Sequence, residues 1–136
     1  MPSPESPLPC EPPPSPLYHR ALDIFVNAYG PEHYEVAINL NNLAALKHDQ
    51  RHFAEAESLY RRSLAIKEKL LGSEHPEIGT TLNNLATLLR VSGKAHEAVH
   101  LFRRAISIYE KTLAPNHPAV MTCRRNYDRC INNSLS

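Results

Sequence analysis

The chain has 136 residues, which is enough for one ordinary domain. Its 15 lysines and arginines almost balance its 14 aspartates and glutamates, so the formal net charge is +1 and no overall field favours nucleic acid or an anionic membrane. No apolar run approaches the roughly 20 residues that a membrane span needs, and the first residues do not have the pattern of a secretory signal. Three cysteines are too few, and odd in number, for a disulfide framework. We therefore expect a cytoplasmic protein with reduced thiols and with neither nucleic acid nor membrane as a partner.

Residues 1–16 contain eight of the twelve prolines. Proline fixes φ and removes a backbone donor, so this stretch is predicted to be a disordered tail with polyproline II character. Its Pro-x-x-Pro spacings fit an aromatic groove on a partner protein, and its Ser-Pro dipeptides fit phosphorylation. An inert tail is the simpler interpretation.

Six helices are predicted after the tail, because apolar residues recur at three- and four-residue steps. The first covers Leu17 to Ala28. The other five are expected at about 34–47, 53–70, 76–90, 95–112 and 118–131, with residues 132–136 frayed. Pro76 and Pro118 stand at the first helical position, where the missing N–H is harmless. Gly93 stands where a helix C-terminus favours a left-handed residue.

A 42-residue repeat organises these helices. Gly30 and Gly72 each open a Gly-x-Glu-His linker that leads into Leu-Asn-Asn-Leu-Ala-x-Leu, and 19 of 42 positions are identical when 30–71 is laid over 72–113. The ordered chain therefore divides into a half repeat at 17–29, whole repeats at 30–71 and 72–113, and a terminal helix at 114–131. A fixed period of this size predicts an array of small helical units, which is typical of a binding surface and not of a catalytic centre.

Small residues recur at matched positions of the two whole repeats. Ala44 and Ala86 lie on the first helix of each repeat, called here the A helix, and Ala56 and Ala98 lie on the second, the B helix. Antiparallel helices need small side chains where their backbones come closest. We therefore place these four alanines at the contact between the A and B helices.

The Leu-Asn-Asn-Leu-Ala-x-Leu motif, the Glu-Ala-x-x-Leu-Tyr/Phe-x-Arg motif and the Gly-x-x-His-Pro linker together resemble the tetratricopeptide repeat. The length of 42 residues is similar to the kinesin light chain and nephrocystin variety of that family. The resemblance covers about 17–131, and it implies an all-α, right-handed solenoid of antiparallel helix pairs. It also implies a concave groove, lined by the A helices, that binds peptide segments of other proteins. The terminal helix has Arg124-Arg125-Asn126-Tyr127 in place of Leu-Asn-Asn-Leu, a polar substitution that is typical of a cap.

In the family, the two asparagine positions of the motif face the groove and hold the backbone of the bound peptide, because an amide both donates and accepts hydrogen bonds. The alternative is that one asparagine of each pair braces the adjacent helix. The same helical face gives the candidate binding residues: Asn41, Asn42, Thr80, Asn83, Asn84, Thr87, Arg90, Arg125, Asn126 and Arg129. Arginines toward one end favour an acidic peptide or a free C-terminal carboxylate, whereas the alternative is that they only keep a cap soluble.

Three functional hypotheses remain. The first is a non-enzymatic adaptor that binds peptides and needs no cofactor. The second is a structural element that docks on another copy, or on a neighbouring domain, through the helix at Leu17–Ala28. The third is a zinc hydrolase, because His96-Glu97-Ala98-Val99-His100 spells H-E-x-x-H on a predicted helix. The repeat weakens the third hypothesis, since Glu97 and Ala98 are ordinary repeat positions and no third ligand is identifiable; we therefore predict no metal site.

Overall fold

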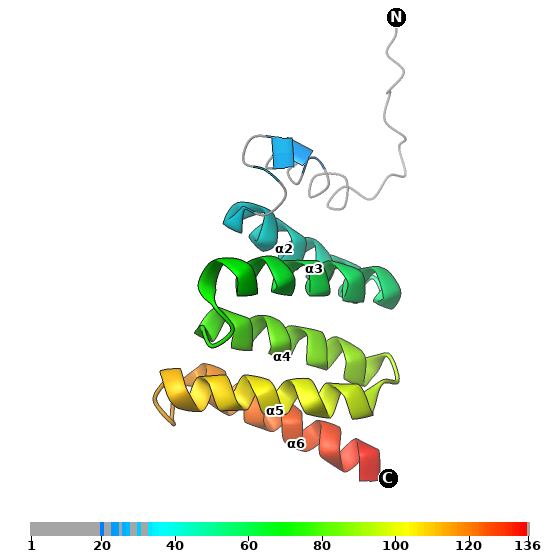
Figure 1. Cartoon of the computed structure of the whole chain (residues 1–136). Coiled ribbons are helices and arrows are strands. Elements are labelled where there is room, and N and C mark those ends of the chain that lie inside the picture. Colours follow the sequence, from blue (N-terminus) through cyan, green and yellow to red (C-terminus); the bar gives the residue numbers. More distant parts are fainter. Residues whose placement is uncertain (1–19, 21–22, 25, 28–29, 31–32, 136) are drawn as a thin grey trace, which may run out of the picture.

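The computed structural model describes residues 20, 23–24, 26–27, 30 and 33–135, and five complete helices lie among them (Figure 1). They are α2 (Tyr34–Asp49), α3 (Phe53–Leu71), α4 (Pro76–Val91), α5 (Ala95–Thr112) and α6 (Pro118–Leu135). The predicted tail at 1–16 lies outside the described residues, and so does most of the half repeat at 17–29, from which the sixth helix is expected. Helix α6 continues to Leu135, past the predicted end at residue 131, and no glycine or proline interrupts it there.

The helices form two layers that run through the whole stack. Helices α2 and α3 pack as one hairpin and α4 and α5 as the next, and α6 follows as a further A helix. Helix α4 contacts both α2 and α6, so the three A helices α2, α4 and α6 are neighbours. In the view of Figure 1 the B helices α3 and α5 lie in front of them. The predicted solenoid of antiparallel helix pairs is confirmed.

Each A helix begins at a histidine that caps it. The Nδ1 atoms of His33, His75 and His117 accept hydrogen bonds from the backbone N–H two residues later, at 3.0, 3.1 and 3.0 Å. A side chain that accepts from the first turn satisfies one of the donors that a helix N-terminus leaves without a partner. The recurring Gly-x-x-His linker is therefore a helix-capping device.

The turns between A and B helices require one left-handed residue. Gly93 has a φ of 91° in the α4–α5 turn, as its place in the sequence predicts. Its equivalent in the first repeat is Arg51, with a φ of 64°, which is uncommon for a residue that carries a Cβ. The repeat therefore fixes the backbone of this turn even where glycine is absent.

The core follows the A helices, and α4 lies at its centre. Ile78, Leu82, Leu85 and Leu89 of α4 are all fully buried. The four alanines predicted at the A–B contacts, Ala44, Ala56, Ala86 and Ala98, are fully buried as well. Gly79 is also buried, and it faces the ring of Tyr109 so closely that a Cβ at residue 79 would lie 2.8 Å from Tyr109 Cε1.

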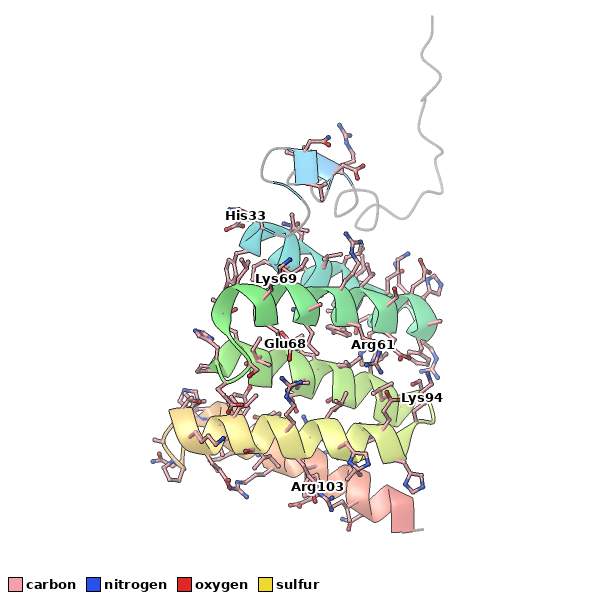
Figure 2. All side chains as sticks on the ribbon, viewed as in Figure 1. His33, Arg61, Glu68, Lys69, Lys94 and Arg103 are labelled. Carbon is pink, nitrogen blue, oxygen red and sulfur yellow. The ribbon has the colours of Figure 1, made fainter. Side chains whose placement is uncertain are left out.

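The B helices are joined across the repeats by ion pairs between exposed or half-exposed side chains (Figure 2). These pairs are Lys94 with Glu57 (3.0 Å), Arg61 with Glu97 (2.5 Å) and Arg104 with Glu68. Exposed pairs of this kind contribute about 0–1 kcal/mol each. They align α3 with α5, while the buried A-helix residues supply most of the stabilisation.

Candidate functional site

The candidate binding residues lie on α2, α4 and α6, because the 42-residue repeat places equivalent side chains on each A helix. Since α4 contacts both of its A-helix neighbours, these side chains form rows that cross the three helices. We call this surface the A-helix face.

Two of the predicted asparagines bond to each other. Asn126 Nδ2 on α6 donates to Asn83 Oδ1 on α4 at 3.3 Å. This bond is the bracing role that the sequence left open as an alternative. Asn126 stands at the second asparagine position of the motif in α6, and Asn83 is the first asparagine of the motif in the preceding repeat. Asn84 stands in the same relation to Asn41, but among the described residues Asn41 Oδ1 is buried without a hydrogen-bond partner.

The two predicted threonines, exposed Thr80 and half-buried Thr87, make hydrogen bonds within the protein through their hydroxyl groups. Thr80 Oγ1 lies 2.7 Å from Tyr109 Oη of α5, and Thr87 Oγ1 donates to the backbone carbonyl of Asn83 at 2.9 Å. The first bond joins α4 to α5 through the Tyr109 hydroxyl, and the second lies within α4.

The remaining candidates offer polar groups to solvent. Asn42, Arg125 and Arg129 are exposed, and Asn84 and Arg90 are half-buried. Arg90 Nε is buried and, within the described part of the chain, has no hydrogen-bond partner. Arg125 and Arg129 stand four residues apart on α6 and therefore share one side of that helix. The predicted basic residues thus lie on α4 and α6, while the predicted residues on α2 are both amides.

A polar cluster that sequence analysis missed lies where α2, α3 and α4 meet. Tyr34 Oη of α2 lies 2.6 Å from both carboxylate oxygens of Glu77 of α4, and Lys67 Nζ of α3 lies 3.7 Å from Glu77 Oε1. The bond to Glu77 raises the pKa of Tyr34 to about 12, and burial lowers the pKa of Lys67. Lys67 Nζ also donates to Thr81 Oγ1 at 3.2 Å. The repeat could not reveal this cluster, because Pro76 and Tyr109 replace Tyr34 and Lys67 in the second copy.

The H-E-x-x-H stretch lies at the start of α5 with both histidines exposed. Glu97, which would be the general base, is paired with Arg61 of α3. Among the described residues no three histidine, cysteine, aspartate or glutamate side chains are grouped closely enough to hold a metal ion.

The thiols of Cys123 and Cys130 are free, and both side chains are fully buried between α6 and α5. Burial raises the pKa of Cys123 to about 11 and also raises the pKa of Cys130. They are core residues of the α5–α6 contact.

Within the described residues, no helix is both long enough and apolar enough to span a membrane.

A sequence model described as tetratricopeptide repeat matches residues 15–69, 41–111 and 77–127, which together cover most of the chain. This chain is a tetratricopeptide repeat protein. Its family explains the two-layer stack, in which each repeat buries its apolar side chains only against its neighbours.

Solved structures place this tetratricopeptide repeat protein near kinesin light chain-like proteins. A Podosopora anserina protein assigned as a kinesin light chain, with nearly identical TPR-like repeats, is 26% identical over 88% of this chain and has a TM-score of 0.72. A variant of that fungal protein has the same identity and a TM-score of 0.74. BtubC (BKLC) from P. vanneervenii, at 22% identity over 89% of this chain and a TM-score of 0.72, shares the fold. The tetratricopeptide repeat protein spans 57% of each Podosopora anserina chain and 54% of BtubC. The search of curated proteins gave no match.

Proposed function

We propose that this tetratricopeptide repeat protein is an adaptor that binds an extended segment of a partner protein on the A-helix face. Proteins of this family are non-catalytic scaffolds that bind other proteins. The partner segment would lie across α2, α4 and α6, held by side-chain amides and guanidinium groups.

The recurrence of exposed amides beside braced ones carries this proposal. Asn83 and Asn126 hold α4 and α6 together, whereas Asn42 is exposed and Asn84 is half-buried. Asn42 and Asn84 are equivalent positions of adjacent A helices, one repeat apart. A row of amides can donate to and accept from the backbone of an extended peptide without demanding a particular sequence.

Charge favours an acidic partner segment, or one that ends in a free carboxylate near α6. Arg125 and Arg129 are exposed on α6, and the half-buried Arg90 lies on the neighbouring α4. Guanidinium groups make strong, often bidentate hydrogen bonds to carboxylates. The neutral amides of α2 would then receive the part of the segment farther from its acidic end.

Binding of a synthetic Glu-rich peptide with a free C-terminus tests the proposal. The wild-type chain should bind it, and Asn42→Ala/Asn84→Ala should weaken binding without a loss of helicity. Arg125→Glu/Arg129→Glu should weaken binding of this peptide and strengthen binding of a Lys-rich peptide of equal length. Equal affinity of all variants for the Glu-rich peptide would contradict the proposal.

The alternative of self-association through the helix expected at Leu17–Ala28 rests mainly on residues outside the described part of the chain. Sedimentation at several concentrations tests it, and a strict monomer would exclude it. The zinc hydrolase hypothesis receives no support from the exposed His96 and His100, whose neighbour Glu97 is held by Arg61.

A further inference from the structure

The outward side of α2 carries two carboxylates that the adaptor proposal does not use. Glu35, Asn42 and Asp49 stand seven residues apart, which is about two helical turns, so they lie along one side of α2. All three residues are exposed. Glu35 and Asp49 therefore belong to the A-helix face, one on either side of the exposed amide of Asn42.

The repeat shows that these acids are lost step by step along the stack. At the positions equivalent to Glu35 and Asp49, α4 has Glu77 and Val91, and α6 has Ala119 and Asn133. The carboxylate of Glu77 already accepts a hydrogen bond from a tyrosine of α2 at 2.6 Å. At these positions, only α2 therefore keeps carboxylates for a partner.

The guanidinium groups of the A-helix face increase in the opposite direction. Helix α2 has no arginine, α4 has the half-buried Arg90, and α6 has the exposed Arg125 and Arg129. The one lysine of α2, Lys47, is buried and lies 3.8 Å from Glu55 of α3. Since α4 lies between α2 and α6, the face is acidic over α2 and basic over α6 (Figure 1).

The charges at the two ends of this face are unpaired within the described part of the chain. Glu35 and Asp49 on α2 form no ion pair there, and neither do Arg125 and Arg129 on α6. An exposed charge that no neighbour neutralises is available to a partner of opposite sign.

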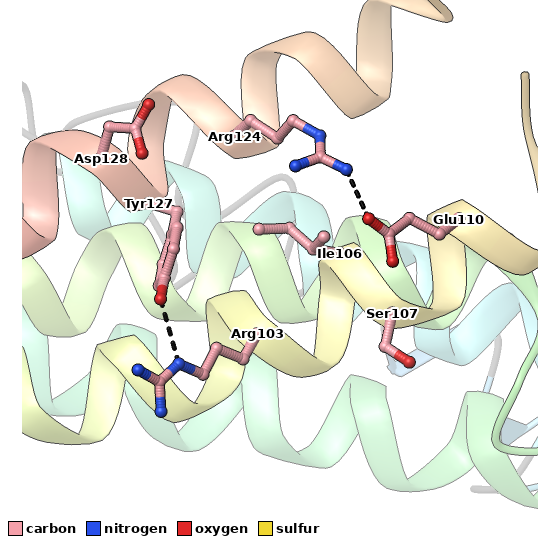
Figure 3. Close-up of a pocket in the computed structure, with 7 residues that line it drawn as sticks. All are labelled: Arg103, Ile106, Ser107, Glu110, Arg124, Tyr127 and Asp128. Carbon is pink, nitrogen blue, oxygen red and sulfur yellow. Dashed lines mark hydrogen bonds and ion pairs between the residues drawn. The ribbon is translucent and has the colours of Figure 1, made fainter. Parts of the chain in front are cut away.

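Charges on the side of α6 that faces α5 are instead used within the protein. Arg124 pairs with Glu110, and Arg103 Nε donates to Tyr127 Oη at 3.0 Å (Figure 3). These side chains line a cavity of about 330 Å³ between α5 and α6. The arginines that remain for a partner on α6 are therefore those of the A-helix face.

The two charged ends are separated by one intervening helix. Packed helices lie about 8–10 Å apart, so α2 and α6 are roughly 16–20 Å apart across α4. An extended chain advances about 3.3 Å per residue, so about five or six residues span that distance.

We propose that the A-helix face binds a partner segment of mixed charge in one direction, with its basic end over α2 and its acidic end over α6. Glu35 and Asp49 receive lysine or arginine side chains, and Arg125 and Arg129 receive carboxylates about five or six residues away. This inference rests on the adaptor function proposed above, to which it adds the basic end of the segment and the direction of binding.

Two synthetic peptides, blocked at both ends, are the probes for the full chain. The Lys/Glu peptide has two lysines, a Ser-Gly-Ser-Gly spacer and two glutamates, and the Ser/Glu peptide has serines in place of the lysines. The wild type should bind the Lys/Glu peptide at least about threefold more tightly, since two exposed ion pairs are added. The affinities are compared at physiological ionic strength, where charges farther away than about 8 Å are largely screened.

Glu35→Lys/Asp49→Lys should reverse this preference while still binding the Ser/Glu peptide. Glu97→Lys/Glu110→Lys makes the same change of charge on α5, a B helix, and should keep the preference of the wild type. Circular dichroism checks that each variant is folded. If the charge reversal on α2 prevents folding, the neutral Glu35→Gln/Asp49→Asn should bind both peptides equally.

A nitroxide label on the Lys/Glu peptide determines the direction of binding. Attached at the lysine end, it should broaden the backbone NMR signals of α2 more than those of α6, and attached at the glutamate end it should do the opposite. The same broadening pattern from both labels would overturn the proposal.

The outcomes separate this inference from the adaptor function. If the wild type binds the Glu-rich peptide of the adaptor test but shows no preference for the Lys/Glu over the Ser/Glu peptide, the adaptor function stands and this inference is wrong. It is also wrong if the α2 and α5 variants change the preference equally. If the wild type binds none of the three peptides, both proposals fail.

Discussion

Tyr34 Oη on α2 and the Glu77 carboxylate on α4 form a contact between consecutive A helices, at 2.6 Å to each oxygen. Together with Asn126–Asn83 it shows that polar side chains 43 residues apart join adjacent A helices. The spacing of the A-helix face therefore depends on polar contacts as well as on the apolar core.

Tyr34→Phe should destabilise the protein by about 1 kcal/mol, because it removes a hydrogen bond to a charged acceptor. The Glu77 side chain is 38% exposed, so the cost should be that of an ordinary hydrogen bond and should fall below the range for buried charged acceptors. Urea unfolding measures it. Tyr127→Phe, which removes an exposed bond from Arg103, is the matched comparison and should cost less.

The same contact predicts how Tyr34 titrates. Its pKa is raised to about 12, mainly by the bond to the Glu77 carboxylate, whereas an ordinary tyrosine ionises near 10. The stability that this contact contributes is complete below pH 10 and is lost as the pH rises toward 12. Absorbance titration of Glu77→Gln should show one tyrosine shifted to lower pH; an unchanged titration would contradict this assignment.

Gly79→Ala should destabilise the protein by about 1–2 kcal/mol, although alanine is the better helix former. Its Cβ would lie 2.8 Å from the buried ring of Tyr109, which Thr80 holds in place. In the first repeat the equivalent pair is Ala37 and Lys67. Glycine thus stands opposite the bulky tyrosine ring, and alanine stands opposite the slender lysine side chain. Combining Gly79→Ala with Tyr109→Leu should cost less than the sum of the two single changes. Strict additivity would show that the close contact is unimportant.

His75→Ala should cost about 1 kcal/mol, because the first turn of α4 loses an acceptor for the N–H of Glu77. His75→Asn should keep most of that stability, since an asparagine oxygen can accept the same bond. Thermal unfolding of the two variants distinguishes these outcomes. Identical losses in both would mean that the imidazole acts by packing and not as a cap.

The buried thiol of Cys123 should make the free energy of unfolding fall at alkaline pH. Burial raises the pKa of its thiol from 9.0 to about 11, so the unfolded chain releases this proton first. Stability should therefore fall as the pH rises from 9 toward 11, and Cys123→Ala should flatten that fall. Urea unfolding at several pH values checks it, and parallel curves for both proteins would refute it.

For the part of the chain from residue 33 onward, the periodicity of the sequence was sufficient to predict the helices and their pairing. It predicted α5 at 95–112, where the structure has Ala95–Thr112, because the Ser92-Gly93-Lys94 turn precedes it and the apolar residues repeat regularly. It did not predict how far α6 runs, since neither glycine nor proline marks a stop before Leu135.

The sequence predicted which residues lie on the A-helix face, but not which of their side chains are free to bind a partner. The repeat places asparagines on each A helix, but whether an amide points to solvent or to its neighbour depends on the distance between helices. Asn83 is bonded to Asn126, while Asn42 is exposed. The cluster around Glu77 could not be predicted from the repeat, because its partners Tyr34 and Lys67 are among the positions at which the two repeats differ.

Chemical-shift mapping of the Glu-rich peptide on the isotope-labelled chain tests the adaptor proposal most directly. The account predicts that the largest changes fall on α2, α4 and α6, with the side-chain amides of Asn42 and Asn84 and the side chains of Arg125 and Arg129 among them. Changes confined to α3 and α5, or to the cavity between α5 and α6, would contradict it.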